Sequence, residues 1–332
     1  MRLWVTAGGT GSAWHIASIV KQYYADKITL YISDINDAEL VASSTLADFF
    51  FKVPPVKETG YAEYMYDLLR ANQIDVIIPL IPWEQRFFAP DLPEFASLGV
   101  RSIAPVSVTD HILNHKKNLY RFCTRHELPV IRQYEKEELE KERIYFCKPV
   151  DGFGAMDACT MSGKEILNRC ESGAFEWEQM IVQEYCEEDG IVQEVTVEAF
   201  WDTKKLRTIC RRRLESKSGV CTKAAVMKLP EADDVIQKIV GLLEMPMVFN
   251  IQFVHHEDCW KVMDVNLRLA AGTGLSNAAG FQLIRALLAD LLGMQMEEDW
   301  FQIDESIKTV LRVYQEISVK STSNAHSKGL SN

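Results

Sequence analysis

The sequence predicts a mixed α/β and α+β protein that begins with a unit built on a parallel sheet. Short apolar runs alternate with helix-like periodicity as far as residue 108, the pattern of a parallel sheet with crossover helices. Beyond residue 140, strand-like runs follow one another with few helices between them. With 332 residues, the chain is long enough for two or three compact units.

Composition excludes several classes of protein. The chain is 47% hydrophobic and 25% charged, as in ordinary globular proteins, and its formal net charge is -11. We therefore expect no general attraction to nucleic acid or anionic membrane. Neither a signal peptide nor an apolar run of about 20 residues is found. The eight cysteines are scattered without a Cys-x-x-Cys pair, which favours a cytoplasmic location over a disulfide framework or zinc site.

In the first unit, apolar runs and helical spacing alternate in a regular order. We expect helices at 15–24 and 61–71, and strands at 3–5, 28–32, 76–80 and 100–104. The turn that follows the first strand, at 8–13, is rich in glycine.

That turn, together with Asp34 after the second strand, imitates a dinucleotide-binding fingerprint, with Ala13 in place of the third glycine. Such a turn also occurs where nothing binds, and it can hold phosphate or carboxylate at a helix N-terminus. An NAD(P)-dependent oxidoreductase is therefore one reading, although no paired catalytic Tyr/Lys or His accompanies the turn.

In the middle of the chain, a strand with a lysine near its end precedes a glycine-containing turn. Asp110 is predicted to cap a helix that runs to His126, and a charged helix or linker follows at 135–143. The strand 144–150 then carries Lys148, whose desolvation is costly unless an anion meets it. A glycine-containing turn beside such a lysine can approach phosphates, but an ordinary hairpin with a snorkelling lysine fits the sequence equally well.

Further strands are expected at 180–186, 192–200, 206–213 and 217–225. Alternation places Glu194, Thr196 and Glu198 on one face. In the run 211–213, alternation also turns at least one arginine inward, which implies a buried carboxylate or an anionic ligand; a fully solvated triplet is the alternative. Helices at 230–244 and 282–292, and a last strand at 307–313, complete the pattern.

The stretch 250–280 is the most informative part of the chain. It reads as two short strands joined by a polar turn, followed by a glycine-rich loop that opens a helix. If the strands are antiparallel neighbours, the side-chain oxygens of Gln252, Asp264 and Asn266 converge, with Arg268 one step beyond. Oxygen ligands of this kind suit Mg²⁺, which takes its remaining ligands from water and phosphates.

In this order, the motifs resemble those of the ATP-grasp superfamily, in the branch of the carbamoyl-phosphate synthetase large subunit and biotin carboxylase. The resemblance covers residues 1–315 and is carried by Lys116, Lys148-Pro-Val-Asp-Gly-Phe-Gly154, Gln183-Glu-Tyr-Cys186, Asn250-Ile-Gln-Phe253 and Asp264-Val-Asn-Leu-Arg268. It implies a Rossmann-like pre-ATP-grasp domain over 1–108, an ATP-grasp domain over 109–316 whose lid subdomain spans about 120–186, and a disordered tail over 317–332.

The resemblance also implies roles for particular residues. The metal ligands are Gln252, Asp264 and Asn266, and they hold two Mg²⁺ ions, with Mn²⁺ as an alternative. Arg268 and Lys148 act on the transferred phosphoryl group. The ATP-binding residues are Lys116, Phe146, Lys148, Gly152, Gly154, Glu184, Tyr185, Cys186 and Glu194. Among them, 184–186 match a hinge that holds adenine largely through backbone groups, and the two glycines match a loop that closes over the phosphates. We predict that the acceptor is held by residues from the set Ser12, Glu84, Arg86, Arg211, Arg213, Lys223, Thr273 and Ser276.

The function implied is an ATP-dependent carboxylate–amine or carboxylate–ammonia ligase that works through an acyl phosphate and releases ADP and phosphate. Two departures from the family pattern are Asp264, where glutamate is common, and Leu267, where proline is common. They support the alternative of an ATP-binding sensor or scaffold without ligation. The expected partners are small molecules, and a homodimer is the default oligomeric state.

Overall fold

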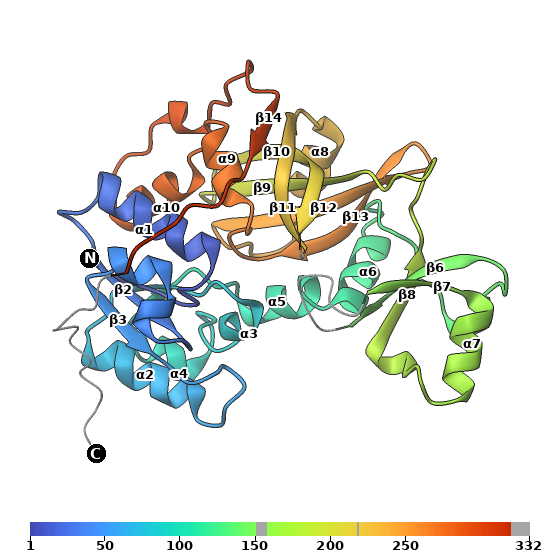
Figure 1. Cartoon of the computed structure of the whole chain (residues 1–332), viewed down its shortest axis with the longest axis horizontal. Helices are drawn as coiled ribbons and strands as arrows, with labels where there is room; N and C mark the ends of the chain where they lie inside the picture. Colours follow the sequence, from blue (N-terminus) through green and yellow to red (C-terminus); the bar gives the residue numbers. More distant parts are fainter. Residues whose placement is uncertain (151–157, 218, 320–332) are drawn as a thin grey trace.

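The computed structural model describes residues 1–150, 158–217 and 219–319, which form three β-sheets with helices packed against them (Figure 1). The first sheet is parallel, with strand order β3-β2-β1-β4-β5. Its strands are β1 (Arg2–Val5), β2 (Thr29–Asp34), β3 (Phe49–Lys52), β4 (Val76–Ile78) and β5 (Arg101–Ser102). The predicted parallel sheet is therefore confirmed, and β3 is an edge strand that the sequence pattern did not reveal.

Helices cover both faces of this sheet because its central strands are apolar on both sides. One face packs against α1 (Gly11–Tyr23), and the other packs against α2 (Tyr61–Ala71). The short helices nearby are α3 (Pro82–Gln85), α4 (Pro93–Ala96) and the 3-10 turns η1 (Ala38–Leu40) and η2 (Ala42–Leu46). In α2, Tyr61, Met65, Leu68 and Leu69 are buried at helical spacing, as the sequence predicted.

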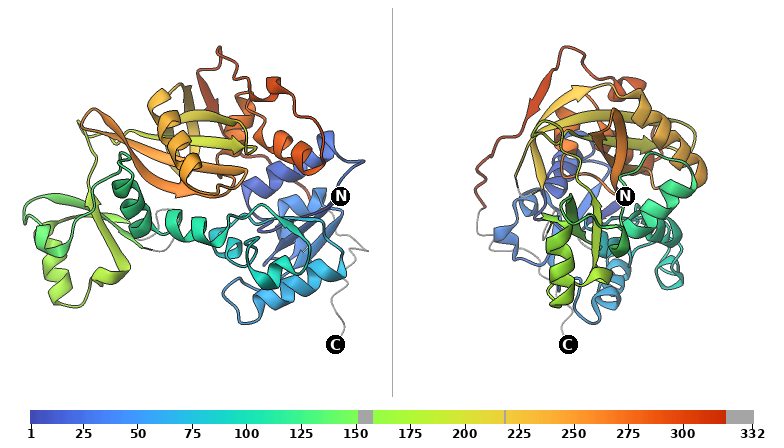
Figure 2. Two further views of the ribbon diagram at one scale, coloured as in Figure 1. Left: turned by 180° about the vertical axis from the view of Figure 1, so that it is seen from behind. Right: turned by 90° about the vertical axis from the view of Figure 1, so that its right-hand side faces the viewer.

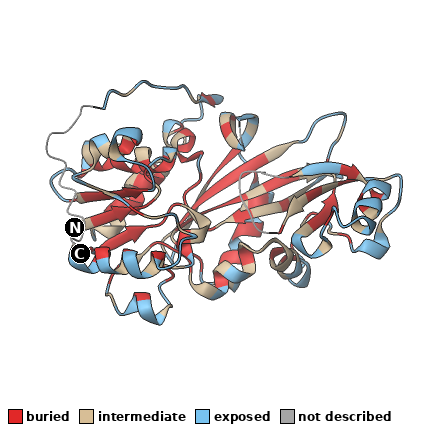
Figure 3. Cartoon of the chain, turned by 60° about the horizontal axis from the view of Figure 1, so that its bottom comes forward, coloured by how far each residue is buried: buried red, intermediate tan, exposed pale blue. Residues whose placement is uncertain are grey.

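The largest sheet is antiparallel throughout, with order β13-β12-β9-β10-β11-β14. Its strands are β9 (Glu194–Trp201), β10 (Leu206–Lys217), β11 (Val220–Met227), β12 (Val248–His256), β13 (Cys259–Asn266) and β14 (Thr309–Leu311). Its accompanying helices are α8 (Pro230–Leu242), α9 (Thr273–Ala278), α10 (Leu283–Leu291) and η5 (Glu298–Phe301). Figure 3 shows its central strands as mostly buried ribbons.

A small antiparallel sheet of order β7-β6-β8 projects from one end of the molecule (Figure 2). It comprises β6 (Ile144–Pro149), β7 (Cys159–Ser162) and β8 (Met180–Glu184), with α7 (Gly163–Glu171), η3 (Lys136–Glu138) and η4 (Trp177–Gln179) beside it. It has its own apolar core around Tyr145, Ile166 and Val182. None of the helices in the described ranges combines the length and apolar character needed to cross a bilayer.

The expected single helix from Asp110 to His126 is wrong. The chain forms α5 (Ser107–Leu113) and α6 (Lys116–Arg125), separated at Asn114 and His115. Asp110 lies inside α5 and its side chain accepts a hydrogen bond from Asn114 Nδ2 at 2.5 Å, so it binds the end of the helix and does not cap its start. The charged run at 135–143 is mostly loop around the single turn η3, and not a helix.

Candidate functional site

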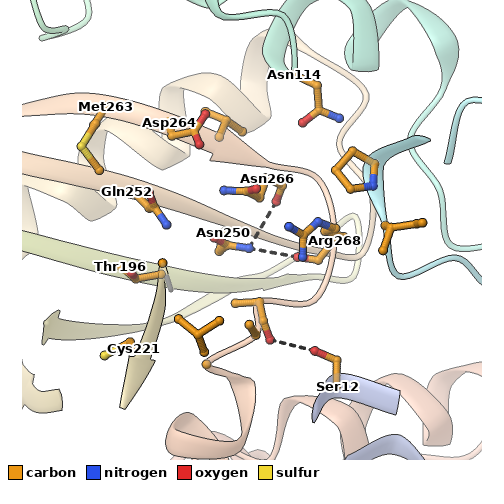
Figure 4. A pocket seen from close by; sticks show the side chains of 18 of the residues that line it. Ser12, Asn114, Thr196, Cys221, Asn250, Gln252, Met263, Asp264, Asn266 and Arg268 are labelled. Carbon is orange, nitrogen blue, oxygen red and sulfur yellow. Dashed lines mark hydrogen bonds between the residues drawn. The ribbon is translucent and has the colours of Figure 1, made fainter. Parts of the chain in front are cut away.

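A cavity of about 980 Å³ lies where the three sheets meet. Its walls come from the N-terminus of α1, the segment after β4, β6, the inner strands of the large sheet and the loop after β13. Of the residues predicted for the site, those that line it are Ser12, Arg86, Lys116, Phe146, Lys148, Glu194, Arg211, Arg213, Gln252, Asp264, Asn266 and Arg268. Figure 4 shows part of this lining.

The predicted convergence of polar side chains on β12 and β13 is confirmed by the strand register. Gln252 pairs directly with Asp264, and Asn250 pairs with Asn266. The next pair is Phe253 with Val262, so Met263 is an extra residue that forms a bulge. Because of this bulge, Val262 can face the apolar core while Asp264, two residues later, faces the cavity.

Hydrogen bonds leave this oxygen cluster open. In the described ranges, no hydrogen bond reaches the side chains of Gln252, Asp264 or Asn266. The Asn250 side chain is already hydrogen-bonded, since its Nδ2 donates to the Arg268 carbonyl at 3.0 Å and to the Asn266 carbonyl at 3.5 Å (Figure 4). Three side chains with free oxygens therefore face the cavity, and a fourth fixes the backbone behind them.

The two predicted lysines lie on the same cavity. Lys148 on β6 donates from Nζ to the Met263 carbonyl at 3.4 Å, directly beside the bulge. Burial lowers the pKa of Lys148 from its usual value, whereas the nearby Asp264 carboxylate opposes that shift. Lys116 begins α6 and donates from Nζ to the Val150 carbonyl at 3.2 Å. An anion between these two lysines would relieve the cost of burying Lys148.

The segment Glu184 to Cys186, expected to form an adenine-binding hinge, does not line the cavity with its side chains. The Glu184 carboxylate is buried and engaged by Arg143 Nη2 and Lys261 Nζ, each at 3.1 Å. Tyr185 points its hydroxyl to Glu187 at 2.5 Å, and Cys186 is buried. Adenine contacts through the backbone of this segment, which the resemblance implies, stay a prediction.

A buried ion pair borders the cavity, and its arginine is one of the lining residues. Arg211 is 1% exposed and pairs with Glu198, also 1% exposed, at 3.0 Å. The prediction that one arginine of the run 211–213 turns inward to a buried carboxylate is therefore confirmed. Thr273 and Ser276 of α9 both donate to Glu198, and Ser276 Oγ accepts from Arg211 Nε at 2.8 Å. These two hydroxyls hold the ion pair and do not face the cavity.

Other residues predicted to bind the acceptor occupy different places. Arg213 pairs with Glu194 at 3.2 Å on the cavity wall, and Arg86 lies 3.6 Å from Asp110. The structure places Lys223 outside the cavity, where it is half exposed and pairs with Glu215 at 2.8 Å. Regular alternation would place Lys223 on the same face as Cys221, which lines the cavity, but the register of β11 against β10 shifts between these two residues.

Glu84 is likewise absent from the cavity lining. It is 5% exposed, and its carboxyl accepts hydrogen bonds from Thr6 and from Tyr61 at 2.8 Å. Burial raises the pKa of Glu84 to about 7. It is therefore a core residue of the first domain. Gly152 and Gly154, expected to cover the phosphates, lie outside the described residues.

The glycine turn does not present its acid to a nucleotide. Asp34 is buried and accepts from the Gly9 amide at 2.7 Å and from the Asn36 amide at 2.9 Å. Gly8 is required because an added Cβ would lie 2.6 Å from Ile32 Cγ2. Asp34 therefore stabilises the turn itself, whereas a dinucleotide site needs this acid for the ribose.

Sequence reasoning missed several residues of the lining, among them Thr10, Asn114, Thr196, Asn250, Cys221 and Arg312. The alternation of β9 and β12 was a usable signal for Thr196 and Asn250, which share faces with Glu194 and Gln252. No local pattern announces Arg312, which follows β14 and reaches the cavity through tertiary packing.

Comparison with protein families supports this arrangement. Residues 176–315 match the model described as ATP-grasp in the biosynthetic pathway with Ter operon. Residues 5–103 match the model described as PylC-like, N-terminal domain. No curated protein matches the sequence at a significant level.

Solved structures share the fold at low sequence identity. N5-carboxyaminoimidazole synthetase from Staphylococcus aureus, in complex with ADP, has a TM-score of 0.69 at 11% identity, covering 89% of this chain and 78% of that one. Biotin carboxylase from Campylobacter jejuni has a TM-score of 0.70 at 14% identity, and the match covers 92% of this chain and 73% of that one. The biotin carboxylase domain of 2-oxoglutarate carboxylase from Hydrogenobacter thermophilus has a TM-score of 0.68 at 15% identity, and the match covers 92% of this chain and 72% of that one. The chain thus carries an ATP-grasp domain that matches over residues 176–315 and a PylC-like N-terminal domain over 5–103, and it shares its fold with N5-carboxyaminoimidazole synthetase and biotin carboxylase.

Proposed function

We propose that this enzyme is an ATP-dependent carboxylate–amine ligase. In the proposed reaction, a carboxylate oxygen attacks the γ-phosphorus of ATP and ADP leaves. An amine or ammonia then attacks the acyl carbon and expels inorganic phosphate. One observation carries the proposal: a single cavity presents the open oxygens of Gln252, Asp264 and Asn266, with Lys148 beside them and Arg268 beyond. This combination suits phosphoryl transfer, in which positioning and charge stabilisation do most of the work.

The residues of the oxygen cluster fit Mg²⁺. Amide and carboxylate oxygens are hard ligands, and here they stand opposite each other on paired strands without internal hydrogen bonds. We propose that Gln252, Asp264 and Asn266 hold two Mg²⁺ ions, with Mn²⁺ as an alternative. When bound, the ions would neutralise charge on the phosphate oxygens. Asp264 supplies the only carboxylate of the three, and it also opposes the lowering of the pKa of Lys148 by burial.

We propose that ATP lies along β6, with its phosphates between Lys116 and Lys148. Phe146 is on the same strand and lines the cavity, so its ring can form one wall of the nucleotide pocket. Glu194 stands at the cavity wall on β9 and is placed to accept hydrogen bonds from ribose hydroxyls. Two of the similar structures were solved with ADP or MgADP, which supports this use of the site.

Arg268 is proposed to steady the carboxylate and the transferred phosphoryl group. Its Nη1 donates to the Leu269 carbonyl at 3.2 Å, while its buried Nε has no hydrogen-bond partner in the described ranges. Burial lowers the pKa of Arg268, and Asp264 opposes this shift. A guanidinium that is buried but incompletely satisfied is well suited to an anionic partner, because that partner removes a desolvation cost.

The test is acid-dependent formation of ADP by the Lys148→Ala enzyme. We expect the substitution to reduce the rate by about 10²–10³-fold or more, as for loss of one charge-stabilising donor. Lys164→Ala, on the exposed face of α7, is the matched control and should retain the wild-type rate. If the Lys148→Ala enzyme forms ADP at the wild-type rate, the site is wrongly assigned.

Asp264 gives the sensor alternative its support, because an aspartate reaches about one methylene less far than the glutamate common in the family. Binding of labelled ATP without ADP formation, across a broad screen of acids and amines, would favour that alternative. A homodimer remains part of the proposal; size-exclusion chromatography with light scattering would decide it.

A further inference from the structure

The cavity carries more positive charge than its two acids balance. Within the described lining, seven residues are basic, namely Arg86, Lys116, Lys148, Arg211, Arg213, Arg268 and Arg312. The acids of the same lining are Glu194 and Asp264. The whole chain has a net charge of -11, so this is a local concentration of cations against the general trend. Low-dielectric walls strengthen the field of such a cavity toward anionic ligands.

Carboxylates near the cavity account for part of this charge. Arg213 pairs with Glu194, Arg211 pairs with the buried Glu198, and Arg86 lies beside Asp110. Under the proposed function, Lys116 and Lys148 belong to the phosphates of ATP. These two lysines are thereby assigned to the nucleotide, whose phosphates carry a charge of about -4.

Arg268 and Arg312 are left without a carboxylate. No salt bridge joins either guanidinium to an acid anywhere in the described ranges. Arginine stays protonated under all ordinary conditions, so both remain charged. One carboxylate of an acceptor would satisfy Arg268 and leave Arg312 unmatched.

Arg312 lines the cavity beside the loop that follows β13. It follows β14, and its Nη2 donates to the Ala271 carbonyl at 2.5 Å. Ala271 is three residues after Arg268, so the two backbone positions are at most about 10 Å apart. Arg312 also lies close enough to Arg211 for mutual repulsion to lower its pKa, although burial is the larger cause.

The N-terminus of α1 also lines this cavity. Thr10 caps the helix by accepting from the Ala13 amide at 3.2 Å, and Thr10, Gly11 and Ser12 all line the cavity. The first amides of a helix have no intrahelical acceptor, and the helix dipole is positive there. Ser12 Oγ donates to the Ala270 carbonyl at 3.2 Å, which ties this wall to the loop that carries Arg312's acceptor (Figure 4).

We propose that the acceptor is a small acid with two separate anionic groups. The reacting carboxylate lies at Arg268, and a second carboxylate or a phosphate lies between Arg312 and the start of α1. This inference rests on the proposed ligase function and specifies its substrate class. An acid with a neutral tail offers no anionic partner to Arg312, so it binds more weakly.

The experiment measures binding of matched acids by calorimetry in the presence of MgADP. The pairs are butyrate and succinate, pentanoate and glutarate, and glycerate and 3-phosphoglycerate. For at least one pair, we expect the member with two anionic groups to bind about 10–100-fold more tightly, as expected for a charge-assisted hydrogen bond. The carboxylate and phosphate arms distinguish the two forms of the second group.

Variants of Arg312 connect that preference to the structure. Arg312→Gln should abolish the preference for the second anion, and Arg312→Lys should restore part of it. Arg169→Gln on α7, far from the cavity, is the control and should leave it unchanged. Equal binding within every pair, absence of saturable binding by all three dianionic acids, or a preference that survives Arg312→Gln would each overturn the proposal.

Failure of this proposal is distinguishable from failure of the ligase proposal. Binding needs no turnover, so the two-anion preference is tested even if no acid supports ADP formation. Conversely, acids with one anionic group that support ADP formation as well as their partners would retain the ligase and reject the second anion.

Discussion

The buried carboxyl of Glu84 should make the stability of the protein depend on pH in a narrow window. Its pKa is raised from 4.5 to about 7, chiefly by burial, while hydrogen bonds from Thr6 and Tyr61 partly oppose the shift. Below about pH 4.5, the group is protonated in both the folded and the unfolded chain. Between 4.5 and 7, only the unfolded chain releases the proton, so the free energy of unfolding falls as pH rises. Above about pH 7, Glu84 is ionised in both the folded and the unfolded chain, and it no longer changes the free energy of unfolding as pH rises.

A shift of this size corresponds to roughly 3 kcal/mol, since each pKa unit is worth about 1.4 kcal/mol. Glu84→Gln removes the ionisation and keeps the shape. The free energy of unfolding of this variant, relative to wild type, should therefore rise by roughly 3 kcal/mol between pH 4.5 and pH 8. Urea unfolding at three pH values in this window measures it.

Glu94→Gln provides the control, because Glu94 is exposed on α4 of the same domain. Its unfolding free energy should follow the wild-type curve at every pH. The reasoning is refuted if Glu84→Gln and wild type show parallel curves, because Glu84 would then ionise normally in the folded protein.

Three further predictions concern the site and its surroundings. In Gly272→Ala, the new Cβ would lie 2.8 Å from Nη1 of the fully buried Arg211, so we expect the free energy of unfolding in urea to fall by about 1–3 kcal/mol. The control Gly241→Ala places its Cβ in open space and should raise the free energy of unfolding by about 0.5–1 kcal/mol. Equal effects of the two substitutions would refute the contact with Arg211. Glu184→Ala removes the buried carboxylate shared by Lys261 and the partly exposed Arg143 and should cost about 1–3 kcal/mol, measured in the same way; a neutral result would show that these ion pairs are solvated. Asp264→Asn should raise the Mg²⁺ concentration needed for half-maximal ADP binding by tenfold or more, and an unchanged titration would exclude Asp264 as a ligand.

Much of the architecture was predictable because its signals are local. Strand alternation and the paired runs around Gln252 and Asp264 predicted antiparallel neighbours, and the register confirms them. The inward arginine of the run 211–213 followed from the same alternation. Prediction of the helix boundaries failed where two local interactions compete for one side chain. Asp110 resembles a helix N-cap in sequence, but it accepts a hydrogen bond from Asn114 at the end of the shorter helix α5.

Other features depend on tertiary contacts that no sequence period encodes. Glu84 comes directly after an apolar strand, as a site residue would, yet Thr6 and Tyr61 enclose it in the core. Arg312 belongs to the cavity only because β14 pairs with β11 and brings its end back to the loop after β13. The bulge at Met263 is similarly invisible in sequence, since it is defined by the partner strand.

The apolar contacts of α1 bear on how the protein can be divided into fragments. One continuous core joins the first sheet, α1, α10 and part of the large sheet, and Tyr24 at the end of α1 donates its hydroxyl to the Arg285 carbonyl at 3.0 Å. A fragment ending at residue 108 would expose the face of α1 that packs on α10 and would be prone to aggregate. The small sheet has a separate core, so it is the part that can unfold locally while the rest stays native.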